Sequence, residues 1–161
     1  MSYTYENEIK VLREGDYEGV LGAYKTVSER TRVEYIRLEF KIRDDVEQEG
    51  KNRIIFDNIF QEKNEKGEPS GVYMKWKVNN ILGAVLTDNE KAAKITFDTI
   101  EDVIKKINGS KVIAHVCVEN NDYTKGEDVN KIKFYKTTKH PSQVLSEDTP
   151  DLEVSDDDLP F

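Results

Sequence analysis

Residues 33–43 read VEYIRLEFKIR, and this segment alternates between apolar and polar side chains more regularly than any other part of the chain. Ile36, Leu38, Phe40 and Ile42 fall on one face, and the aromatic and charged residues between them fall on the other. A period of two is typical of a β-strand with one buried face. The segment therefore predicts a sheet that covers a core on one side and exposes charged and aromatic side chains on the other.

The neighbouring segments predict the remaining elements. Gly15–Val27 and Asn52–Phe60 have the composition of two further strands. Gln61–Gly71 is polar and rich in turn residues, so a mobile loop is expected there. The elements expected after it are two helices and then two strands, at Val72–Leu86, Thr99–Asn108, Lys111–Glu119 and Lys131–Thr137. From His140 onward the chain has many acids and few large apolar residues, which predicts disorder.

This order of elements predicts the fold class. Three strands, a helical connection and two more strands follow one another in the OB-fold, a small five-stranded barrel, although other α+β folds share that order. We therefore expect a mainly β protein in two parts. Residues 1–140 form an OB-fold domain with the helical connection between its third and fourth strands, and residues 141–161 form a disordered acidic tail.

The negative charge of the chain is distributed unevenly. Seven of the 32 acidic residues and none of the 24 basic ones lie in 141–161, which leaves 25 acids against 24 basic residues in 1–140. Because the body is close to neutral, it can carry a basic groove, and the net charge of −8 does not exclude nucleic-acid binding. No apolar run is long enough for a membrane span, no signal-like segment is seen, and the single cysteine suits a reducing compartment, so a cytoplasmic protein is expected.

Few residues have the spacing that an enzyme or a cofactor site needs. Two distant histidines and one cysteine are too few for a zinc site, and there is no phosphate-binding glycine loop or nucleophile motif. Asp44, Asp45 and Asp57 leave open a Mg²⁺-dependent nuclease. The pattern favours a binding protein without a cofactor over an enzyme.

Basic residues are interleaved with aromatic ones in several of the expected strands and loops. Single-stranded DNA offers phosphates to lysine and arginine and flat bases to aromatic rings, and stacking contributes about 1–3 kcal/mol per base whatever the sequence. In an OB-fold the second and third strands and two hairpin loops form the binding groove. The residues predicted to contact single-stranded DNA are Lys25, Arg30, Arg32, Tyr35, Arg37, Lys41, Arg53, Tyr123, Lys125, Lys131, Lys133 and Tyr135. Phe56 and Phe60 are assigned to the core, and Trp76 to a contact between the two helices.

The chain ends in DDDLPF, an acidic run closed by an apolar tip. Carboxylates can steer such a peptide to a basic patch, the apolar tip can fill a pocket there, and the terminal carboxylate can pair with an arginine or lysine. A tail that only confers solubility would explain the aspartates but not the apolar tip. The residues predicted to dock on a protein partner are Asp156, Asp157, Asp158, Leu159, Pro160 and Phe161.

This ending resembles the tail of bacterial and phage single-stranded DNA-binding proteins, which typically finish in Asp-Asp-Asp-Ile-Pro-Phe. The body is similar to a family of phage-encoded single-stranded DNA-binding proteins, on the residues Glu14–Glu18, Ile42–Val46 and Ile54–Asn58, the helix that contains Trp76, and the strand Gly109–Val118. The resemblance implies an OB-fold and sequence-independent binding. It also implies that the tail recruits proteins of replication, recombination or repair, in the cytoplasm of a bacterial host.

Two other functions stay open at this point. An acidic adaptor or DNA mimic that acts on host DNA-binding enzymes would also use the acids, although mimics spread them over the whole body. A Mg²⁺-dependent nuclease would use the aspartates named above. Also open are self-association into a homo-oligomer, the number of nucleotides covered, the preference between DNA and RNA, and the role of residues 61–71.

Overall fold

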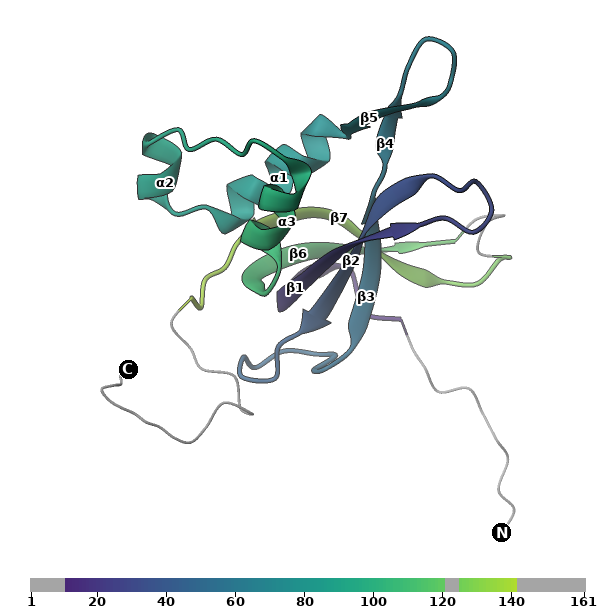
Figure 1. Cartoon of the computed structure of the whole chain (residues 1–161). Helices are drawn as coiled ribbons and strands as arrows, with labels where there is room; N and C mark the ends of the chain where they lie inside the picture. Colours follow the sequence, from purple (N-terminus) through teal and green to yellow (C-terminus); the bar gives the residue numbers. More distant parts are fainter. Residues whose placement is uncertain (1–10, 121–124, 142–161) are drawn as a thin grey trace.

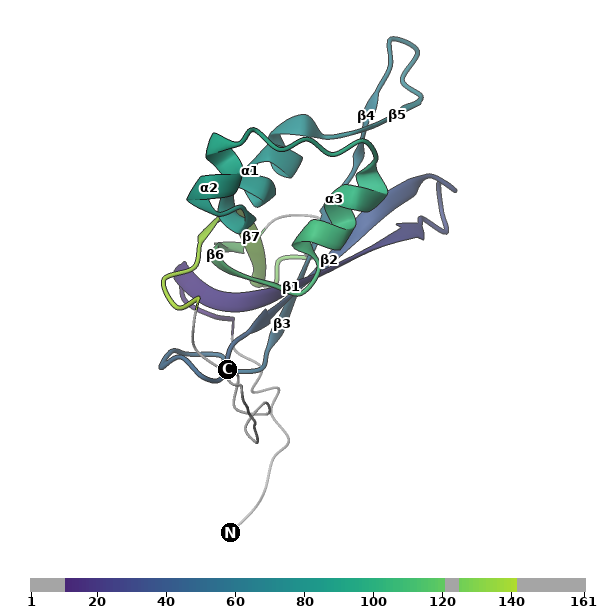
Figure 2. The same ribbon diagram turned by 60° about the vertical axis from the view of Figure 1, so that its left-hand side comes forward.

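The computed structural model describes residues 11–120 and 125–141, and over these residues the protein is mainly β (Figure 1, Figure 2). Five strands form one curled antiparallel sheet in the order β3-β2-β1-β6-β7, and two more form a separate hairpin, β4-β5. The strands are β1 (Gly15–Val27), β2 (Glu34–Ile42), β3 (Ile54–Ile59), β4 (Gln61–Lys63), β5 (Pro69–Tyr73), β6 (Ser110–Glu119) and β7 (Val129–Thr137). The helices, which follow β5 and precede β6, are α1 (Lys75–Val85), α2 (Asp88–Ala92) and α3 (Ile100–Ile107).

The curl of the sheet begins in β1, which pairs with a different strand at each end. Its first part pairs with β6 from Gly15 to Leu21, and its last part pairs with β2 from Gly19 to Val27. A Cβ atom at Gly19 would come within 2.3 Å of the ring of Phe40 and within 2.7 Å of the carbonyl oxygen of Lys41. Residues 19–21 of β1 pair with both β2 and β6, and the close approach at position 19 requires a residue without a side chain.

We expect the substitution Gly19→Ala to lower the free energy of unfolding by about 1–3 kcal/mol, because the added methyl group must displace the ring of Phe40 or the backbone of β2. Gly22→Ala on the same strand is the matched control, since the nearest neighbour of its added Cβ lies at 3.6 Å. Urea unfolding followed by circular dichroism measures both losses. Equal losses in the two variants would contradict the close approach at Gly19.

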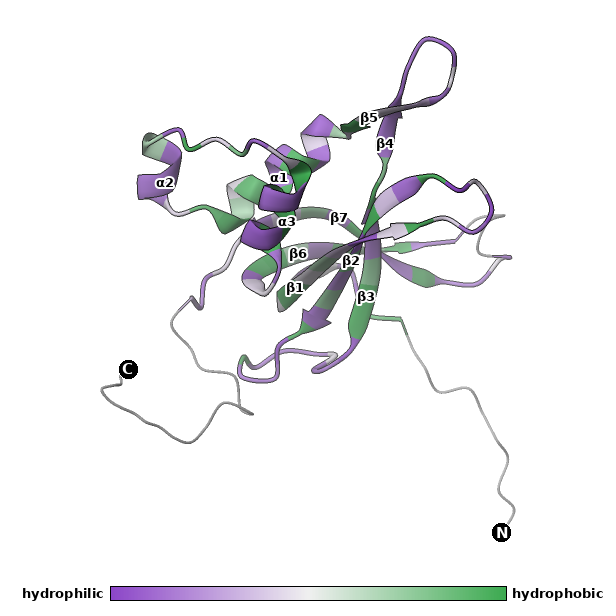
Figure 3. Ribbon diagram, viewed as in Figure 1, coloured by the Kyte–Doolittle hydropathy of each residue, from purple (hydrophilic) through white to green (hydrophobic). Residues whose placement is uncertain are grey.

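The inner face of the curled sheet packs against α1 and α3. Ile36, Leu38, Phe40 and Ile42 are all fully buried, which confirms the inward face predicted for β2. Helix α1 lies against β6 and β7, and α3 lies against β1. The buried residues that the two helices add to the core are Ile81, Ala84, Val103 and Ile107. In Figure 3 the strands accordingly carry both hydropathy colours, whereas the tip of the β4–β5 hairpin is mostly hydrophilic.

Residues 61–71 differ from the sequence prediction, because they form most of an ordered hairpin rather than a mobile loop. The side chain of Asn64 accepts hydrogen bonds from the backbone amides of Lys66 and Glu68 at 2.9 and 3.0 Å, and Gly67 has a φ of 77°. The polar residues that indicated a mobile loop therefore form the tight turn of the hairpin. Because β5 extends to Tyr73, the first helix starts later than predicted, at Lys75.

Side-chain caps mark the starts of α2 and α3. Thr99 accepts a hydrogen bond from the amide of Asp102 at 3.2 Å, which confirms the predicted start of α3, and Gly109 follows that helix with a φ of 83°. Helix α2, which the sequence did not predict, begins with a capping box formed by Thr87 and Glu90.

The two edge strands of the sheet, β3 and β7, lie close to each other without pairing. Side chains bridge this gap, which we call the seam. The hydroxyl of Tyr135 donates to Asp57 at 2.9 Å, and the ammonium of Lys77 pairs with the same carboxylate at 2.7 Å. Asn80 of α1 completes the bridge, because its amide bonds both the N–H and the C=O of Tyr135, at 2.8 and 3.1 Å.

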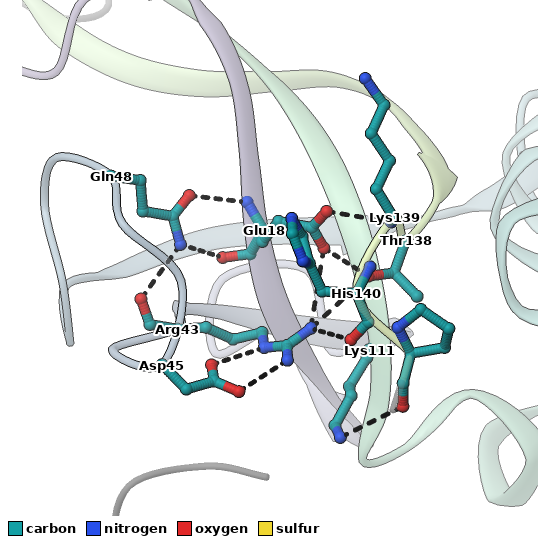
Figure 4. Close-up of polar contacts among 9 residues, drawn as sticks. Glu18, Arg43, Asp45, Gln48, Lys111, Thr138, Lys139 and His140 are labelled. Carbon is teal, nitrogen blue, oxygen red and sulfur yellow. Dashed lines mark hydrogen bonds and ion pairs between the residues drawn. The ribbon is translucent and has the colours of Figure 1, made fainter. Parts of the chain in front are cut away.

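A buried polar network holds the last described residues against the sheet (Figure 4). Arg43 follows β2 and is fully enclosed; it donates to the two oxygens of Asp45 at 2.8 and 2.7 Å and to the carbonyl of His140 at 2.9 Å. Glu18, also buried, lies 3.7 Å from Arg43 and accepts from the amide of Lys139 at 3.0 Å. The start of the C-terminal segment is thus fixed to β1 and β2.

Candidate nucleic-acid interface

The outer faces of β2 and β3 carry aromatic and basic side chains side by side. Because Ile36 to Ile42 point inward at every second position, Tyr35, Arg37 and Lys41 point outward, as the sequence predicted. Strand β3 pairs Asn58 with Arg37, Phe56 with Glu39, and Ile54 with Lys41. We call this outer surface the β2–β3 face.

Two phenylalanines on the β2–β3 face correct the sequence prediction, which placed them in the core. Phe56 is 51% exposed and Phe60 is 53% exposed. The guanidinium of Arg37 lies over the ring of Phe56, 4.4 Å from its centroid, and the ring of Tyr35 lies 5.5 Å from that of Phe60 at an angle of 37°. Neighbouring side chains therefore contact both rings, while about half of each residue stays exposed.

Two cations, Arg37 and Lys41, and one carboxylate, Glu39, lie on this face. Arg37 contacts the ring of Phe56 and donates a hydrogen bond to the side-chain amide of Asn58 at 3.4 Å. Because both partners are uncharged, neither contact neutralises the positive charge of Arg37. Lys41 is exposed and lines a hollow of about 260 Å³ together with Val20 and Ile54. The carboxylate of Glu39 accepts a hydrogen bond from the hydroxyl of Tyr24 at 3.0 Å, which raises the pKa of that phenol.

Two clefts meet at Phe60. The first, which we call the hairpin cleft, has a volume of about 520 Å³ and lies between the β1–β2 loop and the β4–β5 hairpin. Its lining includes Arg30, Tyr35, Phe60 and Lys63. The second, the seam cleft, has a volume of about 490 Å³ and lies along the seam at the start of α1. Its lining includes Phe60, Trp76, Lys77, Lys131 and Lys133.

The structure brings six of the predicted residues to this surface. Arg30 and Tyr35 line the hairpin cleft, Arg37 and Lys41 lie on the β2–β3 face, and Lys131 and Lys133 line the seam cleft. Lys131 also lies 3.4 Å from Glu119, in an exposed ion pair that contributes little.

Two exposed predicted residues lie in hairpin loops rather than in the clefts. Arg32 is in the β1–β2 loop and Lys125 is in the β6–β7 loop, and both have a positive φ, of 62° and 57°. Tyr123 and the six tail residues predicted to dock on a partner, 156–161, lie outside the described residues.

Tyr135 corrects the prediction that its ring stacks on a base, because only 3% of this residue is exposed. The sequence placed Lys131, Lys133 and Tyr135 on one face by a period of two. A β-bulge at Lys133 breaks that period, since His115 pairs with Phe134 while the next residue of β6 pairs with Ile132. Tyr135 therefore points into the core, where burial raises the pKa of its phenol well above the ordinary value.

Two other predicted cations, Lys25 and Arg53, are not among the residues that line either cleft. Lys25 pairs with Glu34 at 3.3 Å and with Glu101 of α3, on the side of β1 that faces the helices. Arg53, half-buried just before β3, lies near Tyr17, where its charge opposes the rise in the pKa of that phenol caused by burial. The expected DNA contacts of Lys25 and Arg53 therefore stay predictions.

Trp76 differs from its predicted place between the helices, since it is 58% exposed on the first turn of α1. It shares the seam cleft with Phe60. The sequence reasoning also missed Lys63, because residues 61–71 were expected to be a mobile loop. For Phe56 the segment gave no clear signal, because Ile55 and Ile59 share the inward side of β3 with the charged Asp57, and this arrangement leaves Phe56 and Phe60 outside.

Two of the three aspartates considered for a nuclease are engaged in ion pairs. Asp45 binds Arg43, which lowers the pKa of that carboxyl through direct hydrogen bonds, and Asp57 binds Lys77 and Tyr135. Within residues 11–120 and 125–141, no group of three or more His, Cys, Asp or Glu side chains is placed to hold a metal ion.

Comparisons with known proteins place the chain in a family. None of the helices within the described segments has the length and apolar character that a membrane crossing requires. No curated protein matches the chain. Residues 2–148 match the model of a family described as "Protein of unknown function (DUF669)". Because this match extends over most of the 161 residues, the chain belongs to the DUF669 family.

Proposed function

We propose that this protein binds single-stranded DNA without sequence preference, and that it acts as a binding protein rather than as an enzyme. The observation that carries the proposal is the β2–β3 face, where Phe56 and Phe60 are exposed beside Tyr35, Arg37 and Lys41. Exposed rings suit stacking with any base, and cations beside them suit the phosphates between bases. Two clefts that contain further cations extend this surface on either side of Phe60.

The strand order supports an OB-fold as the framework. In an OB-fold, five strands form a partly open barrel, and strands two and three together with two hairpin loops bind the nucleic acid. Here β1, β2, β3, β6 and β7 would be those five strands, because β1 pairs with both β2 and β6 and the edges β3 and β7 approach at the seam. In Figure 1 the β1–β2 loop and the described ends of β6 and β7 extend toward the same side of the view.

We infer a role for the tail from its sequence. The DDDLPF ending suits a peptide that docks on proteins of DNA replication, recombination or repair while the body coats the strand. Phage replication in a bacterial cytoplasm is the setting that the resemblance of the sequence suggests. The anchoring of residues 138–140 by Glu18 and Arg43 would make the tail leave the body at a fixed point.

Titration of the full chain with oligonucleotides tests the proposed function. Trp76 lies in the seam cleft, so its fluorescence is expected to change when a single-stranded oligonucleotide binds. Affinity should fall with salt, with a log–log slope of about −0.7 for each phosphate contacted. Equal affinity for single-stranded and duplex DNA would contradict the proposal.

We expect Lys41→Ala to reduce the size of that slope by about 0.7, because one phosphate contact is lost, with a similar fractional loss of affinity for oligonucleotides of different sequence. Lys51→Ala is the matched control, since Lys51 is an exposed lysine that pairs with Glu47 at 2.8 Å, outside the β2–β3 face. Salt titrations of both variants check the prediction. If both variants keep the wild-type slope, Lys41 does not contact phosphate.

A further inference from the structure

The β4–β5 hairpin is an ordered element that buries little of itself. At its root, Gln61 donates to the carbonyl of Glu34 at 2.8 Å and accepts from the amide of Gly71 at 2.8 Å. At its tip, the amide of Asn64 bonds the carbonyl of Glu68 at 2.8 Å. Residues 63–72 are nevertheless all exposed. The hairpin is therefore held firmly at its base and projects from the sheet, as Figure 1 and Figure 2 show.

The projecting hairpin forms one wall of the hairpin cleft, and the β1–β2 loop forms the other. Tyr35 and Phe60 are the aromatic residues of this cleft, and Arg30 and Lys63 come from its two opposite walls. The volume of about 520 Å³ is within the range of about 300–1,000 Å³ that is typical of ligand sites. The cleft thus combines flat apolar surfaces with a positive charge from each wall.

Glu34 and Gln61 also line the hairpin cleft, and their polar groups are already engaged. The carboxylate of Glu34 accepts from the hydroxyl of Tyr73 at 3.1 Å and pairs with Lys25 at 3.3 Å. Both ends of the Gln61 amide are used at the hairpin root. An occupant would therefore be recognised by its flat faces and its negative charge rather than by the edge of a base. A nucleotide within a single strand has both properties.

We propose that the hairpin cleft holds one nucleotide of a bound single strand and that the β4–β5 hairpin keeps the strand on the sheet. The base would stack on the exposed side of Phe60, and the phosphates on either side of it would meet Arg30 and Lys63. This inference rests on the proposed function and adds that residues 61–73 slow the release of DNA. Because Phe60 also lines the seam cleft, the strand can continue from one cleft into the other.

Charge reversal at two lysines of the same hairpin tests the proposal. Lys63→Glu places a negative charge in the hairpin cleft, whereas Lys66→Glu places it in the tip turn, and Lys66 is not among the residues that line the cleft. Both positions are exposed, so both variants are expected to fold. Stopped-flow release of a labelled oligo(dT) should be about tenfold faster for Lys63→Glu and less than about twofold faster for Lys66→Glu.

A photo-cross-link provides the second measurement. Full-length protein irradiated with an oligonucleotide that contains 5-iodouracil should form adducts at Phe60 or Tyr35, identified by mass spectrometry. If the wild type binds single-stranded DNA but the adducts lie only outside the hairpin cleft, the role of the hairpin is overturned and the proposed function stands. The same conclusion follows if the two glutamate variants release the oligonucleotide at equal rates. A wild type that shows no preference for single strands would overturn the proposed function itself.

Discussion

Replacing Arg43 by methionine is expected to lower the free energy of unfolding by about 3–5 kcal/mol, the largest effect on stability that we predict. The side chain of Arg43 is fully buried, and it neutralises Asp45 at 2.7 Å and lies 3.7 Å from Glu18. Without it, two buried carboxylates lose their cation, and the carbonyl of His140 loses a donor. Residues 138–140, which follow β7, should then detach more easily from β1 and from the end of β2.

Arg13→Met is the matched control. Arg13 also pairs with a carboxylate, that of Glu49 at 2.6 Å, but its side chain is 82% exposed, so the loss should be at most about 1 kcal/mol. Urea unfolding of the full chain measures both variants. A loss below about 1 kcal/mol for Arg43→Met would show that burial of this network contributes no more than a surface pair does.

The Arg43→Met variant should also change how the free energy of unfolding depends on pH. Hydrogen bonds from Arg43 hold the pKa of Asp45 below its ordinary value. Asp45 thus adds stability that is fully present above its pKa in the unfolded chain, about 3.9, and is lost as the pH falls toward its lower folded-state pKa. The difference between wild type and Arg43→Met should be constant above about pH 5 and should shrink below about pH 4.

Removing the exposed rings is expected to have the largest effect on binding. Phe56→Ala and Phe60→Ala should each weaken the binding of single-stranded DNA by about 1–3 kcal/mol, or roughly 5- to 150-fold, because each loses a surface for base stacking. Phe56 also supports the guanidinium of Arg37 at 4.4 Å, so its loss should also loosen a phosphate contact. Equilibrium titration with oligonucleotides at constant salt measures these losses.

Phe134→Ala is the control for the loss of an exposed phenylalanine. Phe134 is 36% exposed, but it stacks on His115 with the ring centroids 4.8 Å apart, on the outer side of β6 and β7. Its removal should leave DNA affinity within about twofold of the wild type. If all three variants bind equally well, base stacking on the β2–β3 face is not the source of affinity.

The placement of Phe56 shows why part of the candidate site could not be predicted. Strand β3 has apolar side chains on both faces, at Ile54, Ile55, Phe56 and Ile59, so composition does not indicate which face is buried. Pairing with β2 settles the matter, because Phe56 lies opposite Glu39, on the outer side. The result is the reverse of the prediction: the rings most suitable for stacking were assigned to the core.

Strand β7 shows a second reason why part of the candidate site could not be predicted from the sequence. Its basic residues were identified from composition, and Lys131 and Lys133 do face outward. A single extra residue at the bulge then reverses every later position, which turns Tyr135 inward to Asp57 and Asn80. A bulge depends on the partner strand, so a period of two counted along one segment does not reveal it.

Local sequence patterns were sufficient to predict features that depend on interactions between residues close together in the chain. The alternation of β2, the cap at Thr99, the mainly β composition and the gathering of acids after residue 140 could all be read from residues 1–161 in order. Contacts between distant segments were needed for the rest: the burial of Arg43, the hairpin at 61–73 and the meeting of both clefts at Phe60. Strand register and side-chain burial arise from packing between elements, and packing is a property of the assembled sheet rather than of any single segment.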